Sequence, residues 1–429
     1  MLKTFSFAAA VALIANAASG GSPICITGPC PPTPPAYEFI NLNGFFSTGY
    51  RAIAMNNAAQ VAGHLRSAPA ANFDTLFRWQ NGSLVTLHLP GLVVTPVAIS
   101  ASGVIVANVY VPMVGASPQP MIWNPDAGTH ETFDPDPPFD ATGINDDLLI
   151  TGLTQDALSG VVFDATTGSI SVIALDDPPP AGVGTAGAAD VNNAGVAVGQ
   201  EVIFADDFPV PAWLERAYRW TESGGATILP LGRQLAAARA TAINELGDIV
   251  GTGTDFDFAF KPTIWPARRG DPIVINPPFG YFVADGTHIN NVGQIGTVAP
   301  NDLFGFTEAF LWKDGFYTDL TEVAPPDIPG RVARIFGLND AGDVLVHTTV
   351  DIFVTSYGIL REIPADVASD LNGDGVVNGL DLGILLANWS IPAGSPGCGG
   401  AGDCAADLNS DGVVDGLDLG ILLSDWTLR

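Results

Sequence analysis

The residues best suited to chemistry lie near the end of the chain, where aspartate and asparagine recur at fixed spacing in residues 370–381 and, 37 residues later, in residues 407–418. Calcium is held by about six to eight oxygen atoms, and an EF-hand-type loop supplies them from positions 1, 3, 5, 7, 9 and 12, with glycine at position 6. Position 7 contributes its backbone carbonyl. The predicted ligands are Asp370, Asn372, Asp374, Val376, Asn378 and Asp381, and then Asp407, Asn409, Asp411, Val413, Asp415 and Asp418. The two segments therefore predict two bound calcium ions.

Each of these loops is followed by an apolar segment that predicts a short helix. The apolar residues recur at the same offsets: Leu380, Leu382, Ile384, Leu385, Leu386 and Trp389, then Leu417, Leu419, Ile421, Leu422, Leu423 and Trp426. A helix of about ten residues is not stable alone in water, so we expect the two copies to pack on each other once calcium orders their loops. No helix is predicted to enter either loop, because Pro364 shortly precedes the first.

A loop and an exiting helix, present twice with aspartate at position 12, resemble the type I dockerin module of cellulosome proteins over residues 366–429. The resemblance implies a small α-helical calcium-binding domain that attaches the chain to a cohesin-like or cell-envelope partner. In that family the recognition residues, often Ser-Thr, follow the ninth-position ligand. This chain has Gly379-Leu380 and Gly416-Leu417 there, which argues against a cellulosomal cohesin. The alternative is that calcium only holds a small tail domain together.

The long segment in front, residues 37–363, repeats a unit of two hairpins. The first hairpin carries asparagine or serine before a glycine turn, at positions 56, 100, 145, 192, 244, 290 and 339. The second centres on an aromatic residue followed by glycine: Trp79, Trp123, Phe163, Trp220, Trp265, Trp312 and Phe353. The spacing of 44 to 52 residues is the length of a four-stranded propeller blade. The fold class predicted is therefore mainly β, a β-propeller of about seven blades, with a pair of β-sandwiches as the alternative.

The repeat signatures, such as Ile289-Asn290-Asn291-Val292-Gly293 and Leu311-Trp312-Lys313-Asp314-Gly315, resemble those of the extracellular HAF repeat family. The resemblance implies a propeller closed by pairing a strand from one terminus with the blade at the other. Residues Tyr37 to Leu42 are the expected closing strand, which would remove the exposed sheet edges. Such a propeller would offer a rigid surface to a glycan or protein ligand.

The N-terminus predicts export. Lys3, an apolar run from Phe5 to Ile14 and the small residues that follow are typical of a secretory signal. We therefore divide the chain into a signal peptide (1–18), a proline-rich tether (19–36), the propeller (37–363) and the calcium-binding module (364–429). Beyond the signal no apolar stretch reaches the roughly 18 residues that a membrane span needs. The expected location is outside the cell or attached to its surface.

The four cysteines form two short-range pairs, Cys25 with Cys30 and Cys398 with Cys404. An exported chain meets an oxidising environment, so two disulfides are the simplest prediction. The alternative is a four-thiolate zinc site, which would require distant pairs to converge, and neither pair has the usual zinc-knuckle spacing. The cysteine-containing spacer also resembles the dockerin-like tails of some environmental bacteria, which implies surface anchoring or sorting.

The charge and the missing motifs restrict the function. A net charge of -29, from 16 basic and 45 acidic residues, repels phosphate backbones and excludes a nucleic-acid partner. The sequence has no nucleophile elbow, His-Glu-x-x-His helix or phosphate-binding glycine loop, which favours a non-enzymatic binding or display protein.

Two other functions remain open. A surface-layer structural component is one. The second is a carbohydrate-active enzyme of polysaccharide degradation, because two carboxylates that converge at a propeller axis would cut a sugar bond. The candidate carboxylates are Asp146, Asp147, Asp176, Asp177, Asp206, Asp207, Asp255 and Asp257.

Overall fold

A computed structural model describes residues 36–45, 49–66, 73–112, 118–155, 159–173, 184–205, 212–268, 270–301, 306–326, 328–350, 355–363, 369–372, 377–389, 404–409 and 412–426. The predicted signal peptide, and the predicted tether up to residue 35, lie outside these residues, as do Cys25 and Cys30. Within the described part, no helix is both long and apolar enough to cross a membrane.

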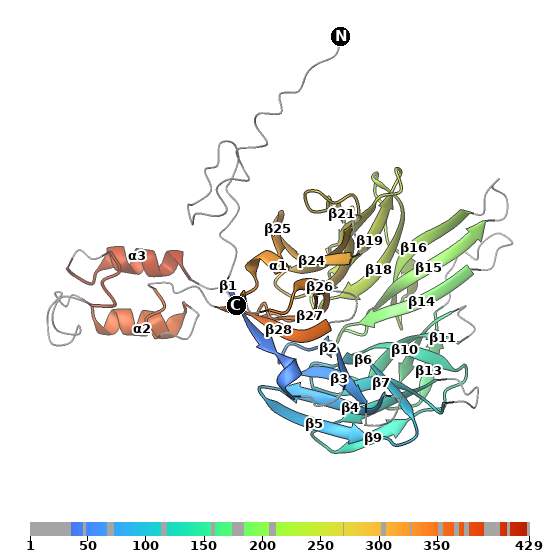
Figure 1. Ribbon diagram of the computed structural model, residues 1–429. Coiled ribbons are helices and arrows are strands. Elements are labelled where there is room, and N and C mark those ends of the chain that lie inside the picture. Colours follow the sequence, from blue (N-terminus) through green and yellow to red (C-terminus); the bar gives the residue numbers. More distant parts are fainter. Residues whose placement is uncertain are drawn as a thin grey trace, which may run out of the picture. The chain divides into compact units, whose positions relative to one another are not determined.

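Residues 36–363 fold into seven antiparallel four-stranded sheets, the blades of a propeller (Figure 1). Blade 1 contains β2 (Tyr50–Met55), β3 (Val61–Arg66), β4 (Phe73–Gln80) and β5 (Ser83–His88). Blade 2 contains β6 (Val93–Ile99), β7 (Ile105–Tyr110), β8 (Gln119–Asn124) and β9 (Thr129–Thr132). Blade 3 contains β10 (Phe139–Ile144), β11 (Leu149–Thr154), β12 (Gly160–Asp164) and β13 (Ser169–Val172).

The remaining blades follow the same strand order. Blade 4 contains β14 (Gly184–Val191), β15 (Ala197–Ala205), β16 (Ala212–Thr221) and β17 (Gly225–Ile228). Blade 5 contains β18 (Leu235–Ile243), β19 (Ile249–Asp255), β20 (Phe260–Trp265) and β21 (Ile273–Val274). Blade 6 contains β22 (Asp285–Ile289), β23 (Ile295–Asn301), β24 (Phe306–Lys313) and β25 (Phe316–Asp319), followed by the one-turn helix α1 (Leu320–Val323). The prediction of about seven four-stranded blades is confirmed, and the β-sandwich alternative is excluded.

Blade 7 closes the ring with a strand from the other end of the described chain. It contains β26 (Arg331–Leu338), β27 (Val344–Thr349), β28 (Thr355–Ile363) and, outermost, β1 (Ala36–Asn41). β1 pairs with β28 in an antiparallel register that places Tyr37 opposite Glu362. The predicted closing strand is thus confirmed, except that Leu42 already begins the short 3-10 helix η1 (Leu42–Phe45).

The repeated asparagine connects the turn of its own hairpin with the turn of the next blade. In blade 5, Asn244 Oδ1 accepts the backbone N–H of Asp248 at 2.8 Å, which closes the turn around Gly247 with its φ of +85°. Asn244 Nδ2 donates to the carbonyl of Asn290 in blade 6 at 3.1 Å. The amide therefore serves two structures at once, its own hairpin and the junction with the next blade.

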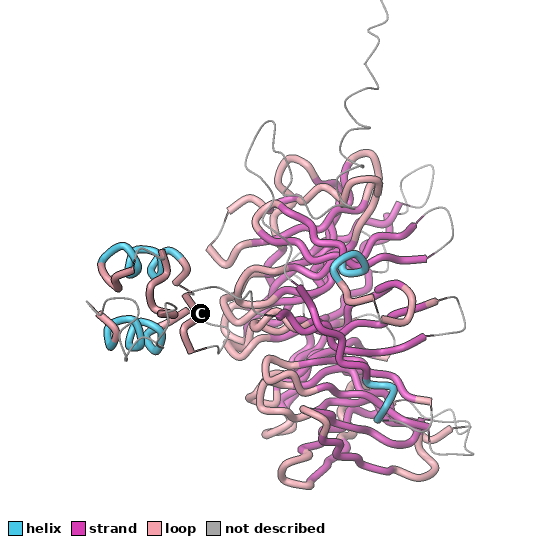
Figure 2. Tube along the Cα trace, turned by 60° about the vertical axis from the view of Figure 1, so that its left-hand side comes forward, coloured by secondary structure: helices cyan, strands magenta, loops and turns pink. Residues whose placement is uncertain are grey.

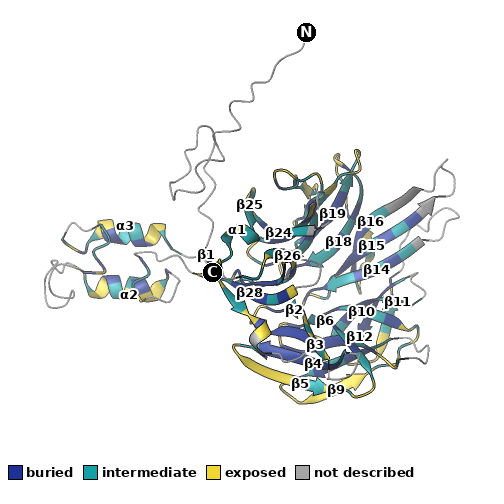
Figure 3. Ribbon diagram, viewed as in Figure 1, coloured by how far each residue is buried: buried dark blue, intermediate teal, exposed yellow. Residues whose placement is uncertain are grey.

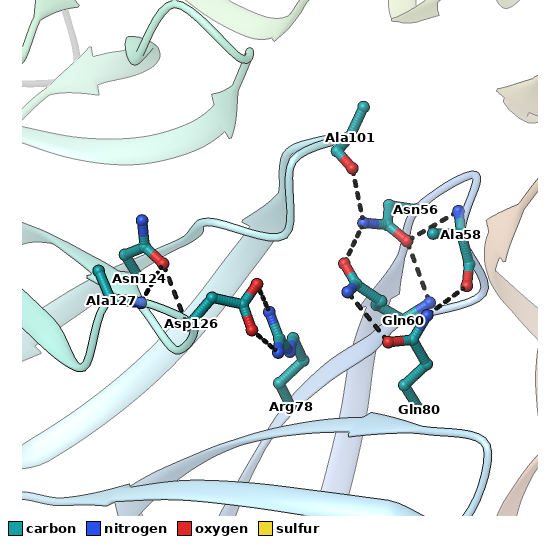
Figure 4. A network of polar contacts seen from close by, with 9 residues as sticks. All are labelled: Asn56, Ala58, Gln60, Arg78, Gln80, Ala101, Asn124, Asp126 and Ala127. Atoms are coloured by element: carbon teal, nitrogen blue, oxygen red, sulfur yellow. Dashed lines mark hydrogen bonds and ion pairs between the residues drawn. The ribbon is translucent and has the colours of Figure 1, made fainter.

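The same arrangement joins other neighbouring blades. Asn56 Nδ2 donates to the Ser100 carbonyl of blade 2 at 2.9 Å. Figure 4 shows Asn56 between Gln60 of its own turn and Ala101 of the blade 2 turn. Farther from the axis, Arg78 Nη1 of blade 1 donates to Asp126 Oδ2 of blade 2 at 2.9 Å. Equivalent amide bonds link blades 3 to 4, 4 to 5 and 6 to 7, through Asn145, Asn192 and Asn290.

The apolar core lies between the blades. The predicted aromatic residues Trp79, Trp123, Phe163, Trp220 and Trp265 are buried in clusters to which adjacent blades contribute. Trp312 packs half-buried against its cluster, and Phe353 lies outside the described residues. The outer strands β5 and β9 are mostly exposed (Figure 3). Each blade therefore buries its inner strands and leaves its outer edge in water, as a radial array of sheets requires.

Helix dominates only the C-terminal module (Figure 2). It contains α2 (Gly379–Ala387) and α3 (Gly416–Ser424), which pack against each other as predicted. Their shared core repeats at the same 37-residue offset, with Val377 and Leu385 from the first copy and Val414 and Leu422 from the second. As expected for so small a core, two short helices stabilise one another.

Candidate calcium-binding module

The two helices begin at residues that were predicted as calcium ligands. Asn378 and Asp415 are the N-caps of α2 and α3, and their side chains accept the N–H of Leu380 and Leu417 at 2.7 and 2.8 Å. Such caps satisfy backbone donors that have no partner within the helix. Positions 9 and 12 of each loop therefore belong to the start of the helix as well as to the loop.

The twelfth residue of each loop ties that loop together. The Asp381 carboxylate accepts the backbone N–H of Asn378 at 2.8 Å and of Asn372 at 3.2 Å. Asp418 accepts the corresponding N–H groups of Asp415 and Asn409 at 2.8 and 3.1 Å. The two copies thus share one geometry, which connects positions 3, 9 and 12.

Both of these carboxylates are fully buried. Burial alone would raise the pKa of Asp381, but backbone N–H donors, first that of Asn378, stabilise its charge and hold the pKa below its usual value. Neither Asp381 nor Asp418 forms an ion pair with a described residue. A buried ionised carboxylate without a paired cation is costly, so a bound cation would stabilise it.

The first residue of the second loop also has a defined contact. Asp407 Oδ2 accepts the N–H of Gly412 at 2.9 Å. Gly412, at position 6, has a φ of +95°, which a side chain would strain, so glycine is required at this sharp turn. The bond between positions 1 and 6 brings the loop back toward its own start.

Three predicted ligands, Asp374, Val376 and Asp411, lie outside the described residues. Asp370, Asn372, Asp407 and Asn409 lie in the described loop segments, and Val413 is exposed. Among the described residues, no group of three or more His, Cys, Asp or Glu side chains is close enough to hold a metal ion. The ligand sets therefore remain predictions. Their donors are all oxygen, which fits calcium and not zinc.

The apolar residues of the two helices divide into two sets. Leu385 and Leu422 are buried between the helices, whereas Leu380, Leu386, Leu417 and Leu423 are 65, 51, 64 and 52 % exposed. We expected the helices to pack through their apolar residues, but each helix is apolar on most of its circumference and only one side can face its partner. Sequence periodicity gave no signal for which leucines would stay outside.

Cys404 is buried in the module core and is disulfide-bonded. Its predicted partner, Cys398, lies outside the described residues, so the pairing stays a prediction.

The carboxylates predicted as candidates for a sugar-cleaving pair have structural contacts where they are described. Asp146 accepts the Ser102 N–H at 2.7 Å across the junction of blades 3 and 2. Asp255 accepts two N–H groups of its own turn and pairs with Lys261. Asp147 and Asp257 are also described, in turns of blades 3 and 5. Four other candidates, Asp176, Asp177, Asp206 and Asp207, lie outside the described residues.

A different group of acids lies at one mouth of the axis. A cavity of about 190 Å³ there is lined by the turn residues of all seven blades and includes Asp190, Glu245 and Asp340. Burial raises the pKa of Asp190 to about 6, although it accepts the N–H groups of Val191 and Ile243. Sequence analysis missed these acids as a group, because each comes from a different repeat.

Comparison with protein families shows that residues 368–424 match the family described as "Dockerin type I domain". Domains of this family bind calcium and cohesins. The chain therefore contains a dockerin domain behind a seven-bladed propeller. A comparison with curated proteins found no match.

Several solved structures are similar to this chain at low sequence identity. The β-propeller domain of the Trilobed protease from Pyrococcus furiosus is 12% identical, with 72% of this chain and 97% of that chain covered and a TM-score of 0.49. Streptogramin B lyase is 13% identical, with 76% of this chain and 97% of that chain covered and a TM-score of 0.46. The RRP9 WD40 repeats are 11% identical, with 76% of this chain and 98% of that chain covered and a TM-score of 0.45. At these values the likeness carries no information on activity.

Proposed function

We propose that this chain is an extracellular binding or display protein whose dockerin domain attaches it, in the presence of calcium, to a cohesin-like partner or to the cell surface. The observation that carries the proposal is the repeated pair of exposed leucines, Leu380 with Leu386 and Leu417 with Leu423. They lie on helices whose first turns are held by the predicted calcium ligands.

Exposed leucines at matching positions of both copies favour a contact surface over a purely structural tail. Burying apolar area is worth about 25 cal/mol per Å², so a half-exposed leucine retains roughly 1 kcal/mol of unused burial. A module that calcium only held together would gain nothing from leucines on its outside. Exposed leucines that recur at the same positions of two copies are consistent with an interaction site.

Calcium is proposed to bind each loop through its six predicted ligands, with Asp381 and Asp418 closing the two sets. Residues 364–429 contain ten aspartates and one arginine, so without a cation the loops repel themselves. A bound ion supplies positive charge to these carboxylates. The loop residues in turn hold the N-terminal turns of α2 and α3, which carry Leu380 and Leu417.

The remaining assignments complete the proposal. They are a signal peptide over residues 1–18, a tether over 19–36, HAF-type repeats over 37–363, the module over 364–429, and disulfides Cys25–Cys30 and Cys398–Cys404. The propeller would display a glycan- or protein-binding surface.

The test uses the full chain and a panel of immobilised cohesin domains that is not restricted to cellulosomal ones, measured in calcium and in chelator. We expect binding in calcium only, lost on combining Leu380→Ser with Leu417→Ser. The matched control is Leu84→Ser, an exposed leucine of β5. If the double variant still binds, or if chelator has no effect on binding, the proposed attachment surface is wrong. If the chain binds calcium but binds no cohesin domain, the tail has only a structural role.

Hydrolysis of a polysaccharide is the second candidate, because the axial cavity combines several carboxylates with the raised pKa of Asp190. A glycosidase pair needs one protonated and one ionised acid. Release of reducing ends by the full chain, abolished in Asp190→Asn and Glu245→Gln but not in Asp257→Asn, would establish it. If no polysaccharide of a panel yields reducing ends, hydrolysis is excluded and binding is the only function proposed.

A further inference from the structure

Two arginines occupy equivalent positions in the blades that close the ring. Arg51 lies in β2 of blade 1, five residues before the turn residue Asn56, and Arg334 lies in β26 of blade 7, five residues before Asn339. Both are exposed. The two inner strands contact each other across the junction of the first and last blades. The fold therefore brings together two guanidinium groups that lie far apart in the sequence.

The side chains around them show that the two charges converge. In the strand registers, Arg334 lies opposite His347, and His347 lies opposite Tyr357. Both arginines act on the same two groups: they help to lower the pKa of His347, after burial, and they oppose the burial that raises the pKa of Tyr357. Both guanidinium charges are thus close to one histidine and one tyrosine.

A third arginine adds to the cluster on the blade 1 side. The Arg51 and Arg66 guanidinium carbons lie 5.3 and 4.7 Å from the centre of the Phe73 ring. Phe73 in turn stacks on His64, with ring centres 4.1 Å apart. Arg51 therefore shares one set of neighbours with Arg66 and another with Arg334.

No acidic side chain among the described residues neutralises the charges of Arg51 and Arg334. The side chains of Arg51 and Arg334 form no ion pair and no hydrogen bond there. This differs from the other inner-strand and junction cations, because Arg78, Arg239 and Arg331 each pair with a carboxylate. In a chain with 45 acidic and 16 basic residues, adjacent arginines without an acid are unexpected.

The junction of blades 5 and 6 shows an ion pair at this position. Arg239 of blade 5 and Asp285 of blade 6 also lie five residues before their turn asparagines, and Arg239 Nη2 donates to Asp285 Oδ1 at 2.7 Å. At the junction of blades 7 and 1, Arg334 corresponds to Arg239, and Arg51 stands where the aspartate would be. The place of the carboxylate is taken by a second cation.

We propose that Arg51 and Arg334, with Arg66 beside Arg51, bind an oxyanion group of a ligand at the junction of blades 7 and 1. Carboxylate, sulfate and phosphate share the geometry that a guanidinium recognises with paired N–H donors. The net charge of -29 opposes extended polyanions, so the ligand is a molecule with one or a few such groups.

This inference deepens the ligand-binding role proposed for the propeller and is independent of the tail. The test is calorimetric titration of the full chain with galacturonate, sulfate and phosphate as separate probes, at constant ionic strength. We expect saturable one-to-one binding of at least one probe, and the probe that binds identifies the preferred oxyanion. Affinity should fall at least tenfold in Arg51→Asp and in Arg334→Ala.

The Arg51→Asp variant also controls for folding. At the junction of blades 7 and 1 it creates an ion pair like the one between Arg239 and Asp285, so its melting temperature should be no lower than that of the unchanged chain. Arg233→Ala removes an exposed arginine from the turn before β18, outside the proposed site. This variant should bind each probe as the unchanged chain does. The site would be overturned if no probe binds, or if Arg51→Asp and Arg334→Ala bind a probe as tightly as the unchanged chain does. Calcium-dependent attachment of the tail should be the same in every variant, so failure of the two proposals can be told apart.

Discussion

At the scale of single residues, the turn asparagine of blades 1, 3, 4, 5 and 6 connects its own hairpin with the next blade. Asn244 is buried and makes one bond within its hairpin and one to the next blade. Each net hydrogen bond is worth about 1 kcal/mol, and a buried group left without a partner costs about 1–3 kcal/mol. The asparagine is therefore a point at which local and interblade stability are coupled.

We predict that Asn244→Ala lowers the free energy of unfolding by about 1–3 kcal/mol, because the N–H of Asp248 loses its acceptor and the carbonyl of Asn290 loses one of its two donors. Denaturant unfolding followed by tryptophan fluorescence would measure it. Asn244→Ser should be intermediate, since Ser100 fills this position in blade 2 and its Oγ still accepts the N–H of Val104. Equal stability of the alanine and unchanged proteins would show that the amide bonds contribute little.

The closing aspartates of the tail are predicted to control calcium affinity. Asp381→Asn removes the charge and keeps one of the two oxygens that accept the backbone N–H groups of Asn378 and Asn372. We expect calcium affinity at the first loop to fall at least tenfold, about 1.4 kcal/mol, in calorimetric titration of the full chain. Glu222→Gln, in an exposed turn of blade 4, is the matched control. Unchanged affinity in Asp381→Asn would exclude Asp381 as a ligand.

Buried His64 predicts a loss of stability in acid. Burial lowers its pKa to about 4, from 6.5 in the unfolded chain. Between these pH values the unfolded chain binds more protons than the folded chain. The folded protein therefore keeps its full stability with respect to His64 above about pH 6.5, and loses up to about 3 kcal/mol of it as the pH falls toward 4. Unfolding measured from pH 7 to 4 should show a shallower decline in His64→Gln. A parallel decline in both proteins would contradict the assignment.

At the scale of elements, the closing strand β1 depends on close packing against β28. A Cβ atom added at Gly358 would lie 2.2 Å from the Phe39 ring and 2.9 Å from the Ile40 carbonyl. These residues belong to the strand that completes blade 7. Glycine at this position therefore lets the two ends of the propeller meet.

We predict that Gly358→Ala destabilises the propeller by about 1–3 kcal/mol, the usual cost of overpacking. Gly270→Ala is the control, because its added Cβ would meet nothing closer than 3.9 Å. Thermal unfolding of the full chain would compare them. A melting temperature equal to that of the control would mean that β1 shifts freely and that closure is loose.

The tail helices are short elements whose stability comes from outside themselves. Nine residues with a capping box each, α2 and α3 share one small core. Their caps are the same residues that are proposed to bind calcium, so ion binding and helix formation are expected to be linked. The leucines that face water on both helices then depend on that link for their orientation.

At the scale of the whole molecule, ring closure joins residues that no local pattern could relate. The Asn57 side chain and the Asp340 backbone and side chain bond across the junction of blades 1 and 7. Arg51 and Arg334 meet at the same junction. The junction formed by closure thus has two cations at the positions where the junction of blades 5 and 6 has an ion pair.

The sequence alone determined the features that depend on local spacing. Seven turn residues 44 to 52 apart predicted seven blades, Tyr37 to Leu42 predicted the closing strand, and the oxygen donors of residues 370–381 and 407–418 predicted the dockerin-type loops. These succeed because a hairpin or an ion-binding loop is specified by residues that are neighbours in the chain.

Only the tertiary structure decided which residues from different repeats come together. It placed Asp190 and Glu245 at one axial mouth, left Leu380 and Leu417 exposed, and set Arg51 beside the blade that carries Arg334. The reason is geometric: each repeat specifies its own sheet, but the neighbours of a side chain are set by how the sheets pack around the axis and where the ring closes.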